Sequence, residues 1–169
     1  MNPAFLRSAC PINAALEVFG DKWSLLILRD IIYFGKNSFS DFLASEEGIA
    51  RNILVARLRQ LLAAGIISKK PDDLDSRKQH YAMTETGLGL IPVLLALADW
   101  GIAQVPGDGS TAAWFVAVAS NREAIAARIR ATVLNGGSIF RDGSNGYPAL
   151  VRQLGDGQTG RISVADPGL

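Results

Sequence analysis

The residues with the clearest binding chemistry lie in the stretch 48–65, which contains three arginines and one asparagine but no acidic residue. Arginine can bind a guanine edge through two hydrogen bonds, and asparagine can bind an adenine edge in the same way. Arg51 and Asn52, at the start of this stretch, are therefore candidates for reading bases in the major groove of DNA. The alternative is that both are solvated residues of a first helical turn and bind nothing.

The same stretch has the apolar spacing of an amphipathic helix between two glycines. The apolar positions that recur at this spacing are Ile49, Ile53, Leu54, Leu58, Leu61 and Leu62. On the other face Val55 and Ala56 suit the methyl group of thymine, and Arg59 is either a phosphate contact or a solvated charge. Arg57 lies at the flank, where its head group reaches either a phosphate or a core carboxylate. We interpret the segment as the recognition helix of a helix-turn-helix.

Two further helices are predicted before the helix-turn-helix. The second covers residues 22–34 and is capped by Asp21, because an aspartate side chain accepts hydrogen bonds from first-turn N–H groups. It is apolar on most sides, so other elements must cover it. The first is short and ends at Gly20, and its apolar face consists of Ile12, Ala15, Leu16 and Phe19.

A brief helix over residues 38–43, capped by Ser38, is the predicted first member of the helix-turn-helix. Residues 45–48 form the turn that leads to the recognition helix. Ser40 could donate a hydrogen bond to a DNA phosphate from the start of this brief helix. Helix capping explains the serines of this segment equally well.

After Gly65 the pattern changes to two short strands, 66–70 and 79–84, joined by a polar loop. This arrangement predicts a β-hairpin, which would give the helix-turn-helix a wing. Lys78, at the end of the loop, is a candidate phosphate contact. The loop also contains Asp72 and Asp73, which repel the DNA backbone, so only one side of the wing can face DNA.

The last helix of this region is predicted from about Glu85 to Ala103, with a cap at Thr84 and an interruption at Pro92. Its apolar surface is larger than one winged-helix domain normally covers, so we expect a second copy of the chain to cover it. The residues predicted to form this dimer interface are Leu88, Ile91, Leu94, Leu95, Ala98 and Trp100.

The predicted fold class is mainly α with a small β-hairpin wing (α+β). Residues 1–104 form a winged helix-turn-helix DNA-binding and dimerisation domain, residues 105–110 a linker, and residues 111–169 a small C-terminal α/β extension. Within the extension we expect a strand at 114–118 and a helix from about 120 to 134, or alternatively one continuous helix through both segments. Weaker patterns suggest a helix at 147–154 and a strand at 161–164. Trp114, Phe115 and Tyr147 either line a pocket for an apolar effector or pack the extension against the preceding helix.

The composition excludes several classes of site. The chain has 169 residues and a formal net charge of only +1, so DNA binding must depend on a local basic patch. A single cysteine and a single histidine rule out an internal disulfide and argue against a structural zinc site. No phosphate loop or nucleophile elbow is present, so we expect no enzyme activity and no cofactor. The most apolar run, 88–98, is too short and interrupted to span a bilayer, which predicts a soluble cytoplasmic protein.

Several short motifs in a fixed order resemble the HxlR-type winged-helix transcriptional regulators, relatives of the MarR type. The resemblance covers roughly residues 8–103. The motifs that carry it are Cys10-Pro11, the run from Gly20 to Asp30, Phe39-Ser40-Asp41-Phe42, Gly48-Ile49-Ala50, Leu54, Arg57-Leu58, Leu62, Gly65-Ile66-Ile67, Tyr81, Thr84, Gly87 and Trp100-Gly101.

The resemblance implies a homodimer that binds a near-palindromic operator in double-stranded DNA. Asp75-Ser76-Arg77 resembles the Asp-x-Arg of related regulators, in which the carboxylate steadies an arginine that enters the minor groove. Arg77 is therefore the wing residue expected to bind DNA. The alternatives are a regulator that responds to a small apolar effector and a module that binds no DNA.

Cys10 precedes the first predicted helix, and a helix N-terminus favours thiolate chemistry. A matching cysteine is a redox or electrophile sensor in some relatives. Since the chain has no second cysteine, sensing would require an intersubunit disulfide or an adduct with a small thiol. The alternative is a structural cysteine with no sensing role.

Overall fold

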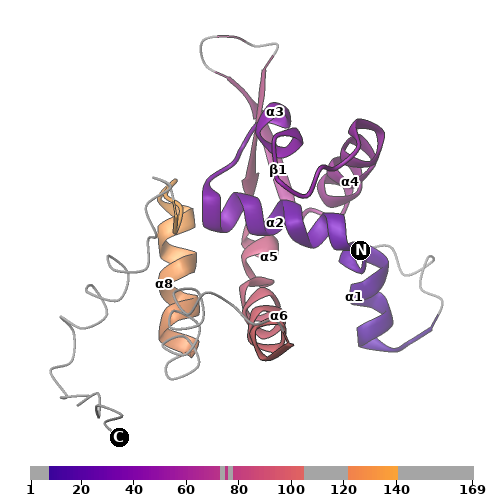
Figure 1. The fold of residues 1–169 in the computed structure, drawn as a ribbon, viewed down its shortest axis with the longest axis vertical. Coiled ribbons are helices and arrows are strands. Elements are labelled where there is room, and N and C mark those ends of the chain that lie inside the picture. The colour runs from indigo at the N-terminus through magenta and orange to yellow at the C-terminus, as the bar shows by residue number, and fades with distance from the viewer. Residues whose placement is uncertain (1–7, 73–74, 76–77, 105–121, 141–169) are drawn as a thin grey trace, which may run out of the picture.

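The computed structural model describes residues 8–72, 75, 78–104 and 122–140. In this part of the chain the fold is mainly helical, with one antiparallel hairpin (Figure 1), as the sequence predicts. The elements in chain order are α1 (Pro11–Phe19), α2 (Lys22–Phe34), α3 (Phe39–Leu43), α4 (Arg51–Ala63), β1 (Ile67–Pro71), β2 (Gln79–Met83), α5 (Glu85–Leu88), α6 (Ile91–Gln104) and α8 (Arg122–Leu134).

Side-chain caps begin three of these helices, at the positions predicted from the sequence. The carboxylate of Asp21 accepts hydrogen bonds from the first-turn N–H groups of α2. Ser38 and Asp41 form a capping box on α3, and the hydroxyl of Thr84 accepts from the N–H of Gly87 in α5. Such caps satisfy N–H groups that have no partner within the helix, so the start of each element is determined locally.

The hairpin joins the helices through its base. Ile67 pairs with Met83 and Pro71 pairs with Gln79, and both residues of the first pair are buried in the core. The N–H of Tyr81 donates to the carbonyl of Asn37 at 2.7 Å, which attaches β2 to the segment before α3. The far end of the hairpin projects beyond α3 in Figure 1, as expected of a wing.

The predicted last helix is two helices, and its expected dimer face is corrected by the structure. The chain breaks between α5 and α6, with Pro92 in the first turn of α6. Four of the side chains that we expected to meet a partner are instead buried within a single chain, because the core and α8 cover that side. The buried residues are Leu88, Ile91, Leu94 and Leu95.

The exposed apolar residues of α6 lie on its other side. Trp100 is 68% exposed, and Val93 and Leu97 are exposed beside it, whereas Ala98 is partly buried. The apolar face of α1 is only partly covered, since Ile12 is 70% exposed and Leu16 is exposed as well, whereas Ala15 and Phe19 are partly buried. Part of the apolar surface of α1 is therefore solvent-facing.

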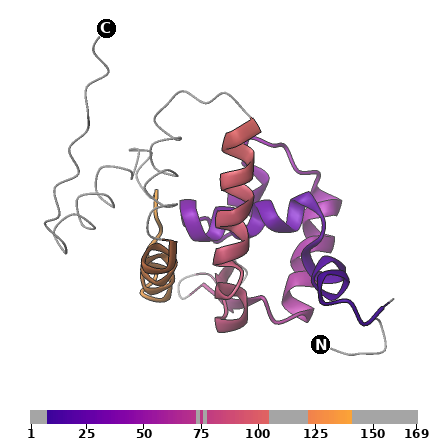
Figure 2. The same ribbon diagram turned by 90° about the horizontal axis from the view of Figure 1, so that it is seen from below.

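The helix predicted in the C-terminal extension is confirmed as α8, and it packs against α6. Arg122 pairs with Asp99 of α6 and Arg130 pairs with Glu85 of α5, so ion pairs link α8 to both helices. Ile125 and Ile129 of α8 are buried in the same core cluster as the helix-turn-helix. In both views α1 and α8 lie on opposite sides of α6 (Figures 1 and 2). The remaining predictions for the extension, the strand at 114–118 and the segments 147–154 and 161–164, lie outside the described residues.

The segment after α8 contacts the end of α2. The N–H of Phe140 donates to the carbonyl of Tyr33 at 2.6 Å, and the two aromatic rings stack with their centroids 5.8 Å apart. Residues 122–140 thus pack against the winged-helix part of the chain at two places.

By length and composition, the stretch Glu85–Gln104 is apolar enough to cross a membrane. A core helix of a soluble protein meets the same criterion. The buried leucines and isoleucines of α5 and α6 account for part of its apolar composition, since 28% of the apolar window is buried.

If α8 shares the core, Ile129→Ala should lower the free energy of unfolding by about 2–4 kcal/mol, because it leaves a cavity among buried side chains. Urea denaturation measures this difference. The control is Leu134→Ala on the same helix, where the side chain is exposed and the cost should stay below about 1 kcal/mol. Equal, small effects of the two substitutions would show that α8 is not part of the core.

Candidate nucleic-acid interface

The outer face of α4 carries the residues that the sequence analysis selected for base contacts. Arg51, Asn52, Ala56 and Arg59 are all exposed, and Val55 is partly buried. The guanidinium carbon of Arg51 lies 5.3 Å from the centre of the Phe39 ring, a cation–π geometry that restrains the side chain. The helix contains no acidic residue, so nothing within α4 opposes an approaching phosphate.

The hairpin places further lysines near this helix. Lys78 is exposed, as are Lys69 and Lys70 on β1, which the sequence analysis did not select. Two successive lysines directly before the polar loop were the available signal. Arg77 lies outside the described residues. Asp75 accepts, through its backbone carbonyl, a hydrogen bond from the N–H of Lys78 at 2.8 Å.

Ser40 is exposed at the start of α3. Its hydroxyl lies 2.9 Å from that of Ser38, which in turn accepts the N–H of Asp41 at 3.2 Å. Capping therefore accounts for Ser38, while Ser40 still presents its hydroxyl to solvent.

His80 of β2 forms polar contacts on both sides of its ring. Its Nε2 lies 2.6 Å from a carboxylate oxygen of Asp72, and its Nδ1 lies 3.0 Å from the side-chain oxygen of Asn37. The histidine thus connects the hairpin loop to the segment before α3.

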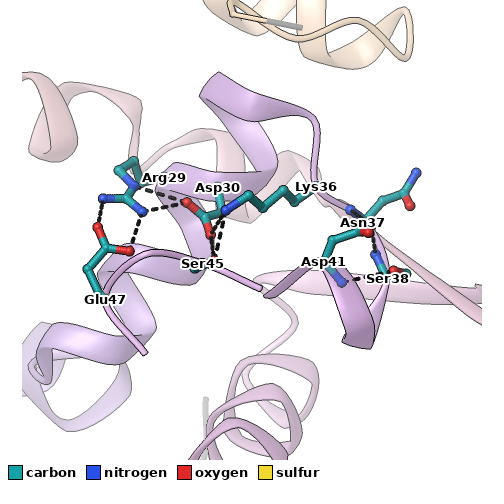
Figure 3. Close-up of polar contacts among 8 residues, drawn as sticks. All are labelled: Arg29, Asp30, Lys36, Asn37, Ser38, Asp41, Ser45 and Glu47. Atoms are coloured by element: carbon teal, nitrogen blue, oxygen red, sulfur yellow. Dashed lines mark hydrogen bonds and ion pairs between the residues drawn. The ribbon is translucent and has the colours of Figure 1, made fainter. Parts of the chain in front are cut away.

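A buried carboxylate positions the turn between α3 and α4. Asp30 is only 2% exposed, and an isolated charge at such a site would be strongly unfavourable. Its oxygens accept hydrogen bonds from Lys36 Nζ at 3.0 Å, from Ser45 Oγ at 2.5 Å and from Arg29 Nε at 3.0 Å (Figure 3). Ser45 belongs to the turn, so the carboxylate ties α2 directly to it.

Arg29 extends this network to the next part of the turn. Its guanidinium donates to both carboxylate oxygens of Glu47 (Figure 3). These hydrogen bonds lower the pKa of Glu47 to about 2, because they favour the ionised carboxylate. Gly48 follows with a φ of +66°, a left-handed conformation that glycine adopts without strain. The chain then turns into α4.

The sequence analysis did not identify this network. Arg29 and Asp30 are polar residues in a helix that is apolar on most sides, and that contrast was the available signal. Their partners Lys36, Ser45 and Glu47 come from two other segments, which the spacing within α2 does not reveal.

Arg57 lies beside a carboxylate in the structure, which corresponds to one of its two alternatives. Its Nη1 donates to the side-chain oxygen of Gln60 at 2.5 Å, and its Nε lies 3.4 Å from Asp21 Oδ1. The side chain is partly buried. Arg57 therefore faces the protein interior, unlike Arg51 and Arg59.

Cys10 is exposed directly before α1. Its backbone N–H lies 3.3 Å from the hydroxyl of Ser8. Among the described residues no group of three or more histidine, cysteine, aspartate or glutamate side chains could hold a metal ion.

Asp30→Asn should lower the free energy of unfolding by about 3 kcal/mol, because it leaves Lys36 and Arg29 without a buried counter-charge. Chemical denaturation at neutral pH measures the loss. Glu46→Gln is the matched control on the same turn, since Glu46 is exposed and its change should cost less than about 0.5 kcal/mol. A loss for Asp30→Asn as small as that of the control would contradict the role assigned to the network.

The sequence profile of the HxlR-like helix-turn-helix family matches residues 18–108. An HTH-type transcriptional regulator of Mycobacterium tuberculosis is 37% identical over 95 residues, which make up 56% of this chain and 59% of that protein. The match thus spans less than two thirds of the mycobacterial relative.

Solved structures show the same fold. The transcription factor PA1607 matches with a TM-score of 0.56 and 37% identity, over 62% of this chain and 72% of that chain. The redox regulator HypR in its oxidised form matches with a TM-score of 0.52 and 28% identity, over 58% of this chain and 100% of that chain. With the family profile matching more than half of its residues, the chain belongs to the HxlR-like helix-turn-helix family.

Proposed function

We propose that the protein is a cytoplasmic transcriptional regulator that binds a near-palindromic DNA operator as a homodimer. The observation that carries this proposal is the outer face of α4, where Arg51, Asn52, Ala56 and Arg59 are exposed on a helix without acidic residues. The network around Asp30 fixes the turn that precedes this helix. The exposed lysines of the hairpin add further positive charge. A net charge of +1 is compatible with DNA binding because the charge is local.

In this proposal the first turn of α4 enters the major groove. Arg51 binds guanine, Asn52 binds adenine, and Val55 and Ala56 contact a thymine methyl group. Phosphates are bound by Arg59 and by two residues outside α4, Ser40 and Lys78. Arg77 enters the minor groove, a role that stays a prediction because the residue lies outside the described part of the chain.

The homodimer is supported by the exposed apolar side chains of α1 and α6. Ile12 and Leu16 on α1, and Val93, Leu97 and Trp100 on α6, are large hydrophobic residues facing solvent. Figure 1 shows both helices away from the projecting end of the hairpin. Burying these residues between two copies removes apolar surface from water and leaves both copies of α4 open. Two such helices about 34 Å apart would match one turn of B-DNA.

The test is binding to operators selected from a random duplex library. Arg51→Ala should lose about 1–3 kcal/mol of discrimination at one position of each half-site. Arg59→Ala, the matched control on the same face, should weaken binding to all sequences and reduce the salt slope by about 1. Sedimentation should give two chains per selected duplex. Unchanged binding by both variants would remove α4 as the DNA-binding element.

A second candidate function, redox regulation through Cys10, is supported by its exposure and by the similarity to the redox regulator HypR. In this proposal the thiols of two copies are oxidised by a peroxide, which is reduced to water, and a disulfide joins the subunits. A regulator responsive to an apolar effector stays a prediction, since Trp114, Phe115 and Tyr147 lie outside the described residues.

If Cys10 is a sensor, peroxide should change the operator affinity of the wild type several-fold, and dithiothreitol should reverse the change, because both act on the thiol. Cys10→Ser should show neither effect. Gel-shift titrations, with non-reducing electrophoresis to detect the disulfide, measure the response. An equal response in wild type and Cys10→Ser would exclude Cys10.

A further inference from the structure

Gln60 connects the inner side of α4 to the C-terminal end of α1. Its Nε2 donates to the carbonyl of Glu17 at 3.1 Å and to that of Val18 at 2.8 Å. Both carbonyls lie in the last turn of α1, where backbone oxygens have no partner within the helix. One side chain of α4 thus binds two carbonyls of α1.

Arg57 continues the connection to the start of α2. It donates to the oxygen of Gln60 at 2.5 Å and lies 3.4 Å from Asp21 Oδ1. Asp21 in turn caps α2, accepting from the N–H groups of Trp23 and Ser24. The three side chains Asp21, Arg57 and Gln60 therefore join α1, α2 and α4 through polar contacts.

The position of Gln60 on α4 makes it sensitive to rotation of this helix. It follows Arg51 by about two and a half turns at 3.6 residues per turn, so the two side chains lie on opposite faces. Apolar packing against Leu54 and Leu58, both buried, has little directional preference. Hydrogen bonds require a defined direction and distance, so those of Gln60 restrict the rotation and sliding of α4 relative to α1.

We propose that Gln60 and Arg57 are positioning residues that couple the recognition helix α4 to α1, so that a displacement of α1 changes base reading by α4. The proposal rests on the DNA-binding function proposed above. Through these contacts, a change at the exposed surface of α1, where Ile12 and Leu16 lie, would alter the position of α4 relative to the DNA bases. Coupling of this kind is reciprocal, so DNA bound at α4 must also change the environment of α1.

The test compares Gln60→Glu, Gln60→Ala and the control Gln104→Glu. Gln60→Glu keeps the shape of the side chain and the acceptor for Arg57 but removes the donor to both carbonyls. Gln104 is exposed at the end of α6, so the same chemical change is made there away from the network. Each full-length variant is titrated with a selected operator and with unrelated duplex at the same salt concentration, and its thermal midpoint is measured.

We expect both Gln60 variants to lose roughly tenfold in the ratio of operator affinity to unrelated-duplex affinity, comparable to one misplaced base contact. Affinity for the unrelated duplex should stay within about twofold, because phosphate contacts carry it. Gln104→Glu should match the wild type. If a Gln60 variant loses both affinities equally and its thermal midpoint falls, the residue is only structural and the proposal is overturned.

A second measurement reads the coupling from α1. Cys10 is the only cysteine in the chain and is exposed, so an environment-sensitive fluorophore can be attached to it specifically. Saturating operator should shift the emission in the wild type and in Gln104→Glu, and the shift should disappear in Gln60→Glu. A persistent shift in Gln60→Glu overturns the coupling.

The two proposals fail in different ways. If the wild type selects no sequence from the library, the DNA-binding function fails and this inference falls with it. If the wild type selects an operator and the Gln60 variants retain its full specificity, only the coupling is overturned.

Discussion

The arrangement of the helix-turn-helix depends on one buried carboxylate. Asp30 is almost fully removed from solvent, so its charge must be compensated where it lies. The groups that compensate it are Lys36 after the end of α2, the neighbouring Arg29 and Ser45 in the turn. Arg29 also holds Glu47. Satisfying this single charge therefore specifies where the turn runs on α2, and with it the direction in which α4 begins.

The recognition helix is consequently held at two places with different partners. The turn network restrains its start, while Gln60 restrains its inner face against α1. The arginines divide accordingly, because Arg57 is engaged in the interior whereas Arg51 and Arg59 remain exposed. Counting basic residues in the sequence cannot separate these roles. Only the placement of acceptors around each guanidinium does so.

The sequence predicted the elements whose signals are local. The start of α2 followed from a cap at Asp21, and the starts of α3 and α5 followed from Ser38 and Thr84, because each cap acts within its own turn. The dimer face was assigned wrongly in part, because Leu88 and Leu95 are covered from elsewhere in the chain. Periodicity shows that a face is apolar but not which element covers it. The network around Asp30 was missed because its partners come from segments outside α2, which the spacing within one helix does not show.

The position of α8 limits where a second copy can bind. It packs against one side of α6 and forms ion pairs with Asp99 of α6 and Glu85 of α5, while α1 lies on the opposite side (Figure 2). A partner helix cannot use the side that α8 occupies unless both ion pairs break and Ile129 becomes exposed. The remaining exposed apolar residues of α6, with those of α1, are therefore the surface through which dimerisation costs least. Because α1 also contacts α4 through Gln60, the proposed dimer would place α1 between the subunit interface and the proposed DNA-binding helix.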